Sequence, residues 1–83
     1  MNSCVIMAVC LDKRSREAAR VQETFTKHGC IIFVRLGLHE SVGSSCSEEG
    51  LILLQLKGTM DEVKALQTDL EALPGVRVKS MEI

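Results

Sequence analysis

The sequence predicts an α+β domain in which two helices cover one face of a four-stranded antiparallel sheet. Two almost unbroken apolar runs, residues 3–11 and 51–56, are typical of strands that are buried on both faces. Each run is followed by a turn, an amphipathic helix and another strand, which gives the order β-α-β-β-α-β. Because crossovers are right-handed and the two apolar strands belong in the middle, we expect the sheet order 4-1-3-2. This arrangement is the ferredoxin-like sandwich.

Length and charge limit the classes of protein to which the chain can belong. Its 83 residues make one domain, residues 1–83, and its basic and acidic side chains are interspersed with a formal net charge of −1. This balance, with two phenylalanines and no tyrosine or tryptophan, argues against nucleic-acid binding. No apolar run reaches the roughly 18 to 20 residues of a membrane span, and the start lacks the basic flank of a secretory signal. We therefore expect a soluble, cytoplasmic protein.

The first helix follows a polar turn, residues 12–15, in which Asp12 or Ser15 is expected to cap the helix start. One face of this helix carries Ala18, Val21, Phe25 and His28. Gly29 is predicted to end the helix, because a left-handed residue after the last turn costs glycine least. The second strand is then expected over residues 30–38, followed by a polar, glycine-bearing loop over residues 39–50.

The second helix has the clearer signals. Thr59 and Glu62 are spaced for a capping box, in which each side chain accepts a hydrogen bond from the other residue's backbone N–H. The apolar stripe that follows at helical spacing consists of Val63, Leu66, Leu70 and Leu73. The last strand, residues 75–83, alternates apolar and charged side chains at first, as expected at a sheet edge. Met81 and Ile83 then fall on the other parity, which either a bulge or an interface contact would explain.

The two central strands are apolar on both faces, although two helices can cover only one face of the sheet. The surplus residues are Cys4, Ile6, Ala8, Cys10, Leu51 and Leu53, or those of the opposite parity. Covering roughly 400 Å² of such surface in each chain contributes about 10 kcal/mol, before association costs of similar size. We therefore expect a homo-oligomer, a dimer or a tetramer, built through the sheet. The alternative is a monomer in which residues 39–50 fold over this face.

Histidine and cysteine offer one candidate metal site. The four cysteines include no CxxC pair, and a free thiol in a reducing compartment packs as a small hydrophobic residue. His39 and Cys46 supply the imidazole and thiolate that suit Zn, Ni or Cu, and His28 and Cys30 flank Gly29. Two ligands in one loop form half a site, which another subunit would complete. A solvated loop is the alternative, and we expect no cofactor.

No residue pattern indicates catalysis. The two histidines are predicted at a helix end and in a loop, and no base and nucleophile are paired. Basic residues that could meet an anionic ligand gather near the first helix start, at Lys13, Arg14, Arg16 and Arg20. Cations there oppose the helix dipole, so a solvated face is the alternative interpretation. We expect a non-enzymatic protein, and a small oligomeric enzyme with its site on the open sheet face is a further hypothesis.

Two passages resemble the iron-only hydrogenase system regulator family. Residues 34–38 (Val-Arg-Leu-Gly-Leu) resemble the family's "GRMG" region, and residues 72–80 (Ala-Leu-Pro-Gly-Val-Arg-Val-Lys-Ser) resemble its "LPGVxVK" ending. The turn and helix-end residues that fit the same template are Asp12, Arg14, Ser15, Phe25, His28 and Gly29. The resemblance covers nearly the whole chain through short, structural motifs.

The resemblance implies an ACT-like fold, similar to the C-terminal domain of nickel-responsive regulators. It also implies a small oligomeric regulatory or ligand-sensing module, linked to the expression or maturation of iron-only hydrogenase. Because the chain has no helix-turn-helix and no basic surface, such a module would act through a partner protein. Amino-acid-binding ACT domains place a glycine in the first strand–helix turn, and residues 12–15 hold none. A Ni- or Zn-sensing module that uses His39 and Cys46 is the alternative function.

Overall fold

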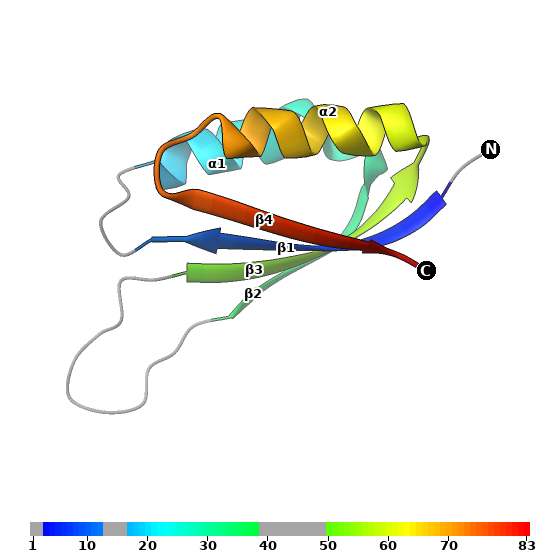
Figure 1. Cartoon of the computed structure of the whole chain (residues 1–83), viewed down its shortest axis with the longest axis horizontal. Coiled ribbons are helices and arrows are strands. Elements are labelled where there is room, and N and C mark those ends of the chain that lie inside the picture. Colours follow the sequence, from blue (N-terminus) through cyan, green and yellow to red (C-terminus); the bar gives the residue numbers. More distant parts are fainter. Residues whose placement is uncertain (1–2, 13–16, 39–49) are drawn as a thin grey trace.

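The computed structural model describes residues 3–12, 17–38 and 50–83. Its elements are β1 (Ser3–Leu11), α1 (Ala18–Lys27), a short 3-10 turn η1 (Gly29–Ile31), β2 (Ile32–Leu38), β3 (Gly50–Gly58), α2 (Met60–Glu71) and β4 (Val76–Glu82). The four strands form one antiparallel sheet in the order β2-β3-β1-β4, and both helices lie on the same side of it (Figure 1). The predicted ferredoxin-like fold, with β1 and β3 in the middle, is confirmed.

The core lies between the sheet and the two helices. On β1 every second side chain is buried, and Val5 and Met7 pair across the sheet with Leu56 and Leu54 of β3. The buried apolar residues are Val5, Met7, Val9, Leu11, Val21, Phe25, Ile31, Leu54, Leu56, Val63, Leu66, Leu70, Val76 and Val78. On each of the three strands that carry these residues, alternate side chains turn toward the helices, so the side chains between them face the other way.

Helix α2 begins through the local contacts that the sequence predicts. Thr59 Oγ1 accepts a hydrogen bond from the Glu62 N–H at 3.2 Å, and Glu62 Oε1 accepts one from the Thr59 N–H at 2.9 Å. The capping box is therefore confirmed. After the helix, Gly75 adopts a φ of 75°, which costs glycine less than any other residue. The Gly75 carbonyl then accepts the Asp12 N–H at 2.7 Å, which joins the end of β1 to the turn before β4.

Helix α1 begins and ends differently from the sequence prediction. It starts at Ala18 with Glu17 at the N-cap position and no side-chain cap, so Asp12 is not its cap, and Ser15 lies outside the described residues. Gly29 was also predicted wrongly as a left-handed C-cap. The C-cap is His28, and the chain continues from it into the right-handed turn η1.

Strand β2 starts at Ile32 instead of residue 30 and contains a bulge between Ile32 and Val34. The later start follows from η1, which buries Ile31 against Gly58 at the end of β3. A Cβ atom on Gly58 would lie 2.7 Å from Ile31 Cγ2, so only glycine fits at this position without displacing its neighbour. Cys30 is consequently exposed in the turn and does not lie in a strand.

Neither helix in the described part of the chain has the length and apolar character needed to cross a membrane.

Candidate functional site: the open face of the sheet

The sheet has one face that the helices leave uncovered, which we call the open face. Side chains alternate along a strand, so the strand register assigns each residue to one face. The open face consists of Val34 and Leu36 of β2, Leu51, Leu53, Gln55 and Lys57 of β3, Cys4, Ile6, Ala8 and Cys10 of β1, and Arg77, Lys79 and Met81 of β4. Its middle row runs across all four strands through Leu36, Leu53, Ala8 and Lys79.

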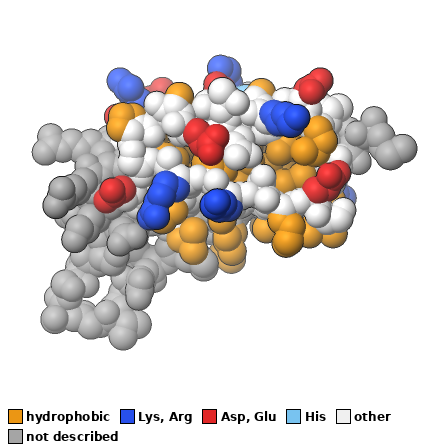
Figure 2. Space-filling model, viewed as in Figure 1, with side chains coloured by type: hydrophobic (Ala, Val, Ile, Leu, Met, Phe, Trp, Pro, Cys, Tyr) orange, Lys and Arg blue, Asp and Glu red, His pale blue; other side chains and the backbone are white. Residues whose placement is uncertain are grey.

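Most of the open face is apolar and accessible. Leu36 is 52% exposed, Val34 52% and Met81 60%, whereas the core residues on the other parity of β1 are at most 9% exposed. Figure 2 shows hydrophobic side chains gathered along the side of the sheet that lies away from the helices. Large exposed apolar side chains that adjoin one another mark interaction surfaces more often than scattered ones do. The open face is therefore the strongest candidate site in the described part of the chain.

The structure resolves which parity of the central strands is left uncovered. The six predicted interface residues, Cys4, Ile6, Ala8, Cys10, Leu51 and Leu53, all belong to the open face. The opposite parity of β1 packs under the helices as part of the core. Their role in an interface stays a prediction, but the alternative parity no longer offers a free surface.

The structure also explains why the apolar residues near the end of the last strand change parity. β1 and β4 pair without interruption from Val5–Glu82 to Leu11–Val76, so β4 contains no bulge in this pairing. Met81 therefore lies on the open face opposite Ile6, because the alternation is regular. Of the two explanations that the sequence left open, the bulge is excluded. An apolar residue at this exposed position is what an interface would require.

The open face has a polar margin on which every charged residue is basic. Arg77 Nη2 donates to Cys10 Sγ at 3.4 Å, and Lys79 is exposed two residues farther along β4. At the end of β3, Lys57 Nζ lies 5.1 Å from the centroid of the Phe33 ring, a cation–π contact that places Phe33 at this margin. The face thus combines an apolar centre with cations toward its β4 edge and at one end.

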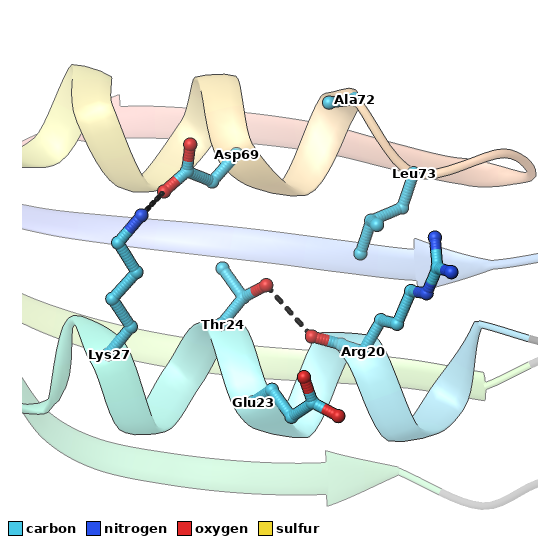
Figure 3. Close-up of a pocket in the computed structure, with 7 residues that line it drawn as sticks. All are labelled: Arg20, Glu23, Thr24, Lys27, Asp69, Ala72 and Leu73. Carbon is cyan, nitrogen blue, oxygen red and sulfur yellow. Dashed lines mark hydrogen bonds and ion pairs between the residues drawn. The ribbon is translucent and has the colours of Figure 1, made fainter.

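A separate feature of the surface is a groove between the two helices. It is an open groove of about 490 Å³ lined by Arg20, Glu23, Thr24, Lys27, Asp69, Ala72 and Leu73 (Figure 3). Lys27 of α1 reaches across to α2, where its Nζ atom lies 3.3 Å from Asp69 Oδ2. His28 Nε2 lies 2.7 Å from the same oxygen. The hydrogen bonds from His28 and Lys27 hold the pKa of the Asp69 carboxyl below its ordinary value.

These contacts indicate that the groove residues join the helices. The His28 side chain is only 14% exposed, and its partner Asp69 lies 41 residues away, so the contact fixes the end of α1 against α2. Arg20, the described member of the predicted basic cluster, has its Nε atom 3.4 Å from Glu17 Oε2. Basic and acidic side chains alternate around the groove, so it has no single charge that would select a ligand.

The structure does not test the predicted metal site in the loop. His39 and Cys46 lie outside the described ranges, and His28 is engaged by Asp69. Cys4 and Cys10 are half-buried on the open face, and Cys30 is exposed in η1. Within residues 3–12, 17–38 and 50–83, no three His, Cys, Asp or Glu side chains form a group that could hold a metal ion.

Sequence reasoning missed three features. Phe33 and Lys57 make a cation–π contact beside the β2 bulge, and the sequence holds no local signal for that bulge. Val34 and Leu36 could have been assigned to the open face from strand alternation, once the register with β3 was known. The His28–Asp69 contact joins residues on different helices, and no spacing rule within one helix predicts it.

Comparisons with known proteins show the fold. The sequence matches no protein-family model and none of the curated proteins. The structure is similar to that of TM1266, an uncharacterized protein from Thermotoga maritima, with a TM-score of 0.87 and 24% identity over 100% of this chain and 99% of the other. It is also similar to CPII, a nitrogen regulatory PII-like protein from Thiomonas intermedia K12 bound to ADP, AMP and bicarbonate (TM-score 0.60, 13% identity, 100% and 96% coverage).

A dimeric ferredoxin-like protein of unknown function from Thermobifida fusca has a TM-score of 0.50 and 13% identity, over 98% of this chain and 92% of the other. At these identities the likeness extends to the backbone arrangement. The chain is therefore a ferredoxin-like α+β domain, whose arrangement of elements a PII-like regulatory protein also has.

Proposed function

We propose that the chain is a small regulatory or ligand-sensing module that self-associates through the open face of its sheet and acts through a partner protein. The proposal is carried by one observation, the apolar surface that the two helices leave uncovered. A regulatory module needs no catalytic group of its own. The open face presents a broad contact surface on the sheet.

The size of the open face fits an interface between copies. Its exposed apolar side chains together present on the order of 400 Å², which is the size of the largest apolar patch on a typical monomer, a patch that is often functional. A standard interface covers about 800 Å² on each partner, of which somewhat more than half is apolar. The open face therefore supplies roughly the apolar area that one side of such an interface contains.

The regulatory part of the proposal draws on the fold and on the sequence. CPII is a nitrogen regulatory protein, and its arrangement of elements is similar to that of this chain. The sequence passages at residues 34–38 and 72–80 support a narrower proposal, in which the module regulates the expression or maturation of iron-only hydrogenase. A gene neighbourhood shared with hydrogenase maturation genes would support this narrower proposal, and its absence would remove that support.

Self-association is tested by light scattering on the purified chain and on two glutamate variants. Leu36→Glu places a carboxylate in the middle of the open face, and we expect it to convert the oligomer to a monomer. Leu36 is already 52% exposed in the single chain, so the fold should tolerate the change. Met60→Glu is the matched control, because Met60 is 37% exposed at the start of α2 and lies outside the open face. A monomeric wild type at micromolar concentration would overturn the proposal.

Ligand sensing is tested by thermal unfolding with ADP, AMP and bicarbonate, the molecules named for CPII. A ligand that binds only the folded state raises the unfolding midpoint. A rise that disappears in Leu36→Glu would place the ligand site between copies. A rise that persists in this variant would place the site within one chain.

A further inference from the structure

We propose that two copies meet with their open faces in one particular orientation, in which β4 of each copy crosses over β2 of the other. Lys79 of one copy then lies over Leu36 of the second copy. This inference rests on the face-to-face association proposed above and adds the orientation of the partner. Two observations carry it, the distribution of charge and the distribution of side-chain size over the open face.

Symmetry leaves two simple ways to stack two copies of this sheet. A face-to-face pair related by a two-fold axis has that axis in the plane between the sheets. With the axis along the strands, β4 lies over β2 and β1 lies over β3 of the second copy. With the axis across the strands, each strand lies over the same strand of the second copy. The strand order β2-β3-β1-β4 makes these two outcomes different, because its two edges have different chemistry.

Charge favours the first arrangement. β4 contributes Arg77 and Lys79 to the open face, whereas β2 contributes Val34 and Leu36 and no charged residue. Stacking β4 on β4 would bring the four cations of two copies together, and like charges placed opposite one another in an interface are costly. Stacking β4 on β2 separates the two cationic strands. It also lets the aliphatic stem of Lys79 cover apolar surface while its ammonium group reaches the wet margin.

Side-chain size favours the same arrangement. In the middle row of the open face, Leu53 of β3 stands beside Ala8 of β1. When β1 lies over β3 of the second copy, each Leu53 meets the Ala8 of the other copy, so a large side chain faces a small one twice. Facing sheets pack by interdigitating their side chains in this way. With the axis across the strands, β3 would face β3, and the larger residues Leu53 and Gln55 would oppose each other.

Thiol crosslinking distinguishes the two arrangements. The four cysteines are replaced (Cys4→Ala, Cys10→Ala, Cys30→Ser, Cys46→Ser), and single cysteines are then introduced as Leu36→Cys or Lys79→Cys in chains with different tags. In the proposed arrangement, positions 36 and 79 face each other across sheets about 10 Å apart. The two copies of position 79 are offset sideways by three strand spacings, about 14 Å. A short bismaleimide spans the first separation and not the second.

The expected product is the mixed one, in which position 36 of one copy is crosslinked to position 79 of the other. The 79–79 and 36–36 products should form no more than the background product of Lys64→Cys, an exposed control position on α2. Light scattering on the wild-type chain separates the two levels of the proposal. A monomer would overturn both the association and its orientation. An oligomer that yields 79–79 or 36–36 products, or no product above the control, would overturn the orientation and leave the proposed function standing.

Discussion

Replacing Gly58 by alanine should destabilise the chain, because the added methyl group has no room. Its Cβ atom would lie 2.7 Å from Ile31 Cγ2 and 3.2 Å from Ile31 Cβ, close to the branch point of a buried side chain. The Cβ atom of isoleucine cannot move without its backbone, and Cγ2 can move only by rotation about χ1, which would take the buried side chain out of its packed position, so the neighbours cannot relax freely. Overpacking of this kind costs about 1–3 kcal/mol, and the lower entropy of the unfolded alanine chain offsets about 0.4–1 kcal/mol of that cost.

The expected net loss is at most about 2.6 kcal/mol and is centred near about 1.3 kcal/mol, and each kcal/mol lowers the unfolding midpoint of a domain of this size by roughly 4–8 °C. Thermal unfolding followed by circular dichroism, at one fixed protein concentration, measures the change. Gly37→Ala is the matched control, since a Cβ at Gly37 meets nothing within 4 Å. In an Ile31→Ala background the Gly58→Ala penalty should shrink, because Cγ2 is gone. An equal penalty in both backgrounds would refute the steric explanation.

Four further outcomes follow from the described contacts. Thr59→Ala removes the capping box and should lower the free energy of unfolding by about 0.5–2 kcal/mol in urea titrations, whereas the exposed Thr68→Ala should have little effect. Asp69→Asn tests pH linkage. The native pKa of Asp69 is lowered, so its contribution is complete above the ordinary carboxyl pKa and is lost as pH falls through the lower native value. The stability difference between wild type and Asp69→Asn should therefore be present at neutral pH and vanish in acid; a constant difference would contradict the linkage. Removing the Phe33 ring with Phe33→Leu should weaken self-association, measured as a higher dissociation constant in sedimentation, if the Phe33–Lys57 margin belongs to the interface. If residues 39–46 bind metal, Ni²⁺ or Zn²⁺ should bind His39→Ala more weakly than wild type, and equal affinities would exclude that site.

The elements with strong local signals were predictable from the sequence. β1 and β3 stand out because a central strand needs apolar residues on both parities, and the start of α2 stands out because Thr59 and Glu62 satisfy each other within one turn. These signals fix the strand order, because the central strands leave only the edge positions for β2 and β4. The identity of the uncovered face did not follow from the sequence, since both parities of β1 are apolar.

The features that the sequence could not predict depend on tertiary contacts. The N-cap position of α1 falls at Glu17, which makes no side-chain capping hydrogen bond and so gives no sequence signal, and the Asp12 N–H is instead bonded to Gly75, a residue that lies far along the chain. The bulge in β2 and the turn η1 arise where Ile31 packs against Gly58, so neither has a signature in residues 28–34 themselves. The sequence indicates surplus apolar surface on the two central strands. Which side chains of β4 adjoin that surface follows only from the pairing of β4 with β1.

The two outer strands determine how an assembly of this chain can grow. Along β2 the bulge between Ile32 and Val34 interrupts the ladder that an added strand would need, and along β4 exposed Arg77 and Lys79 repel a second copy of the same edge. Sheet extension from chain to chain, the first step toward a fibril, is thereby discouraged at both ends. If copies pair through the open face, the pair is closed, because each open face covers the other and the strand edges offer no site for further copies.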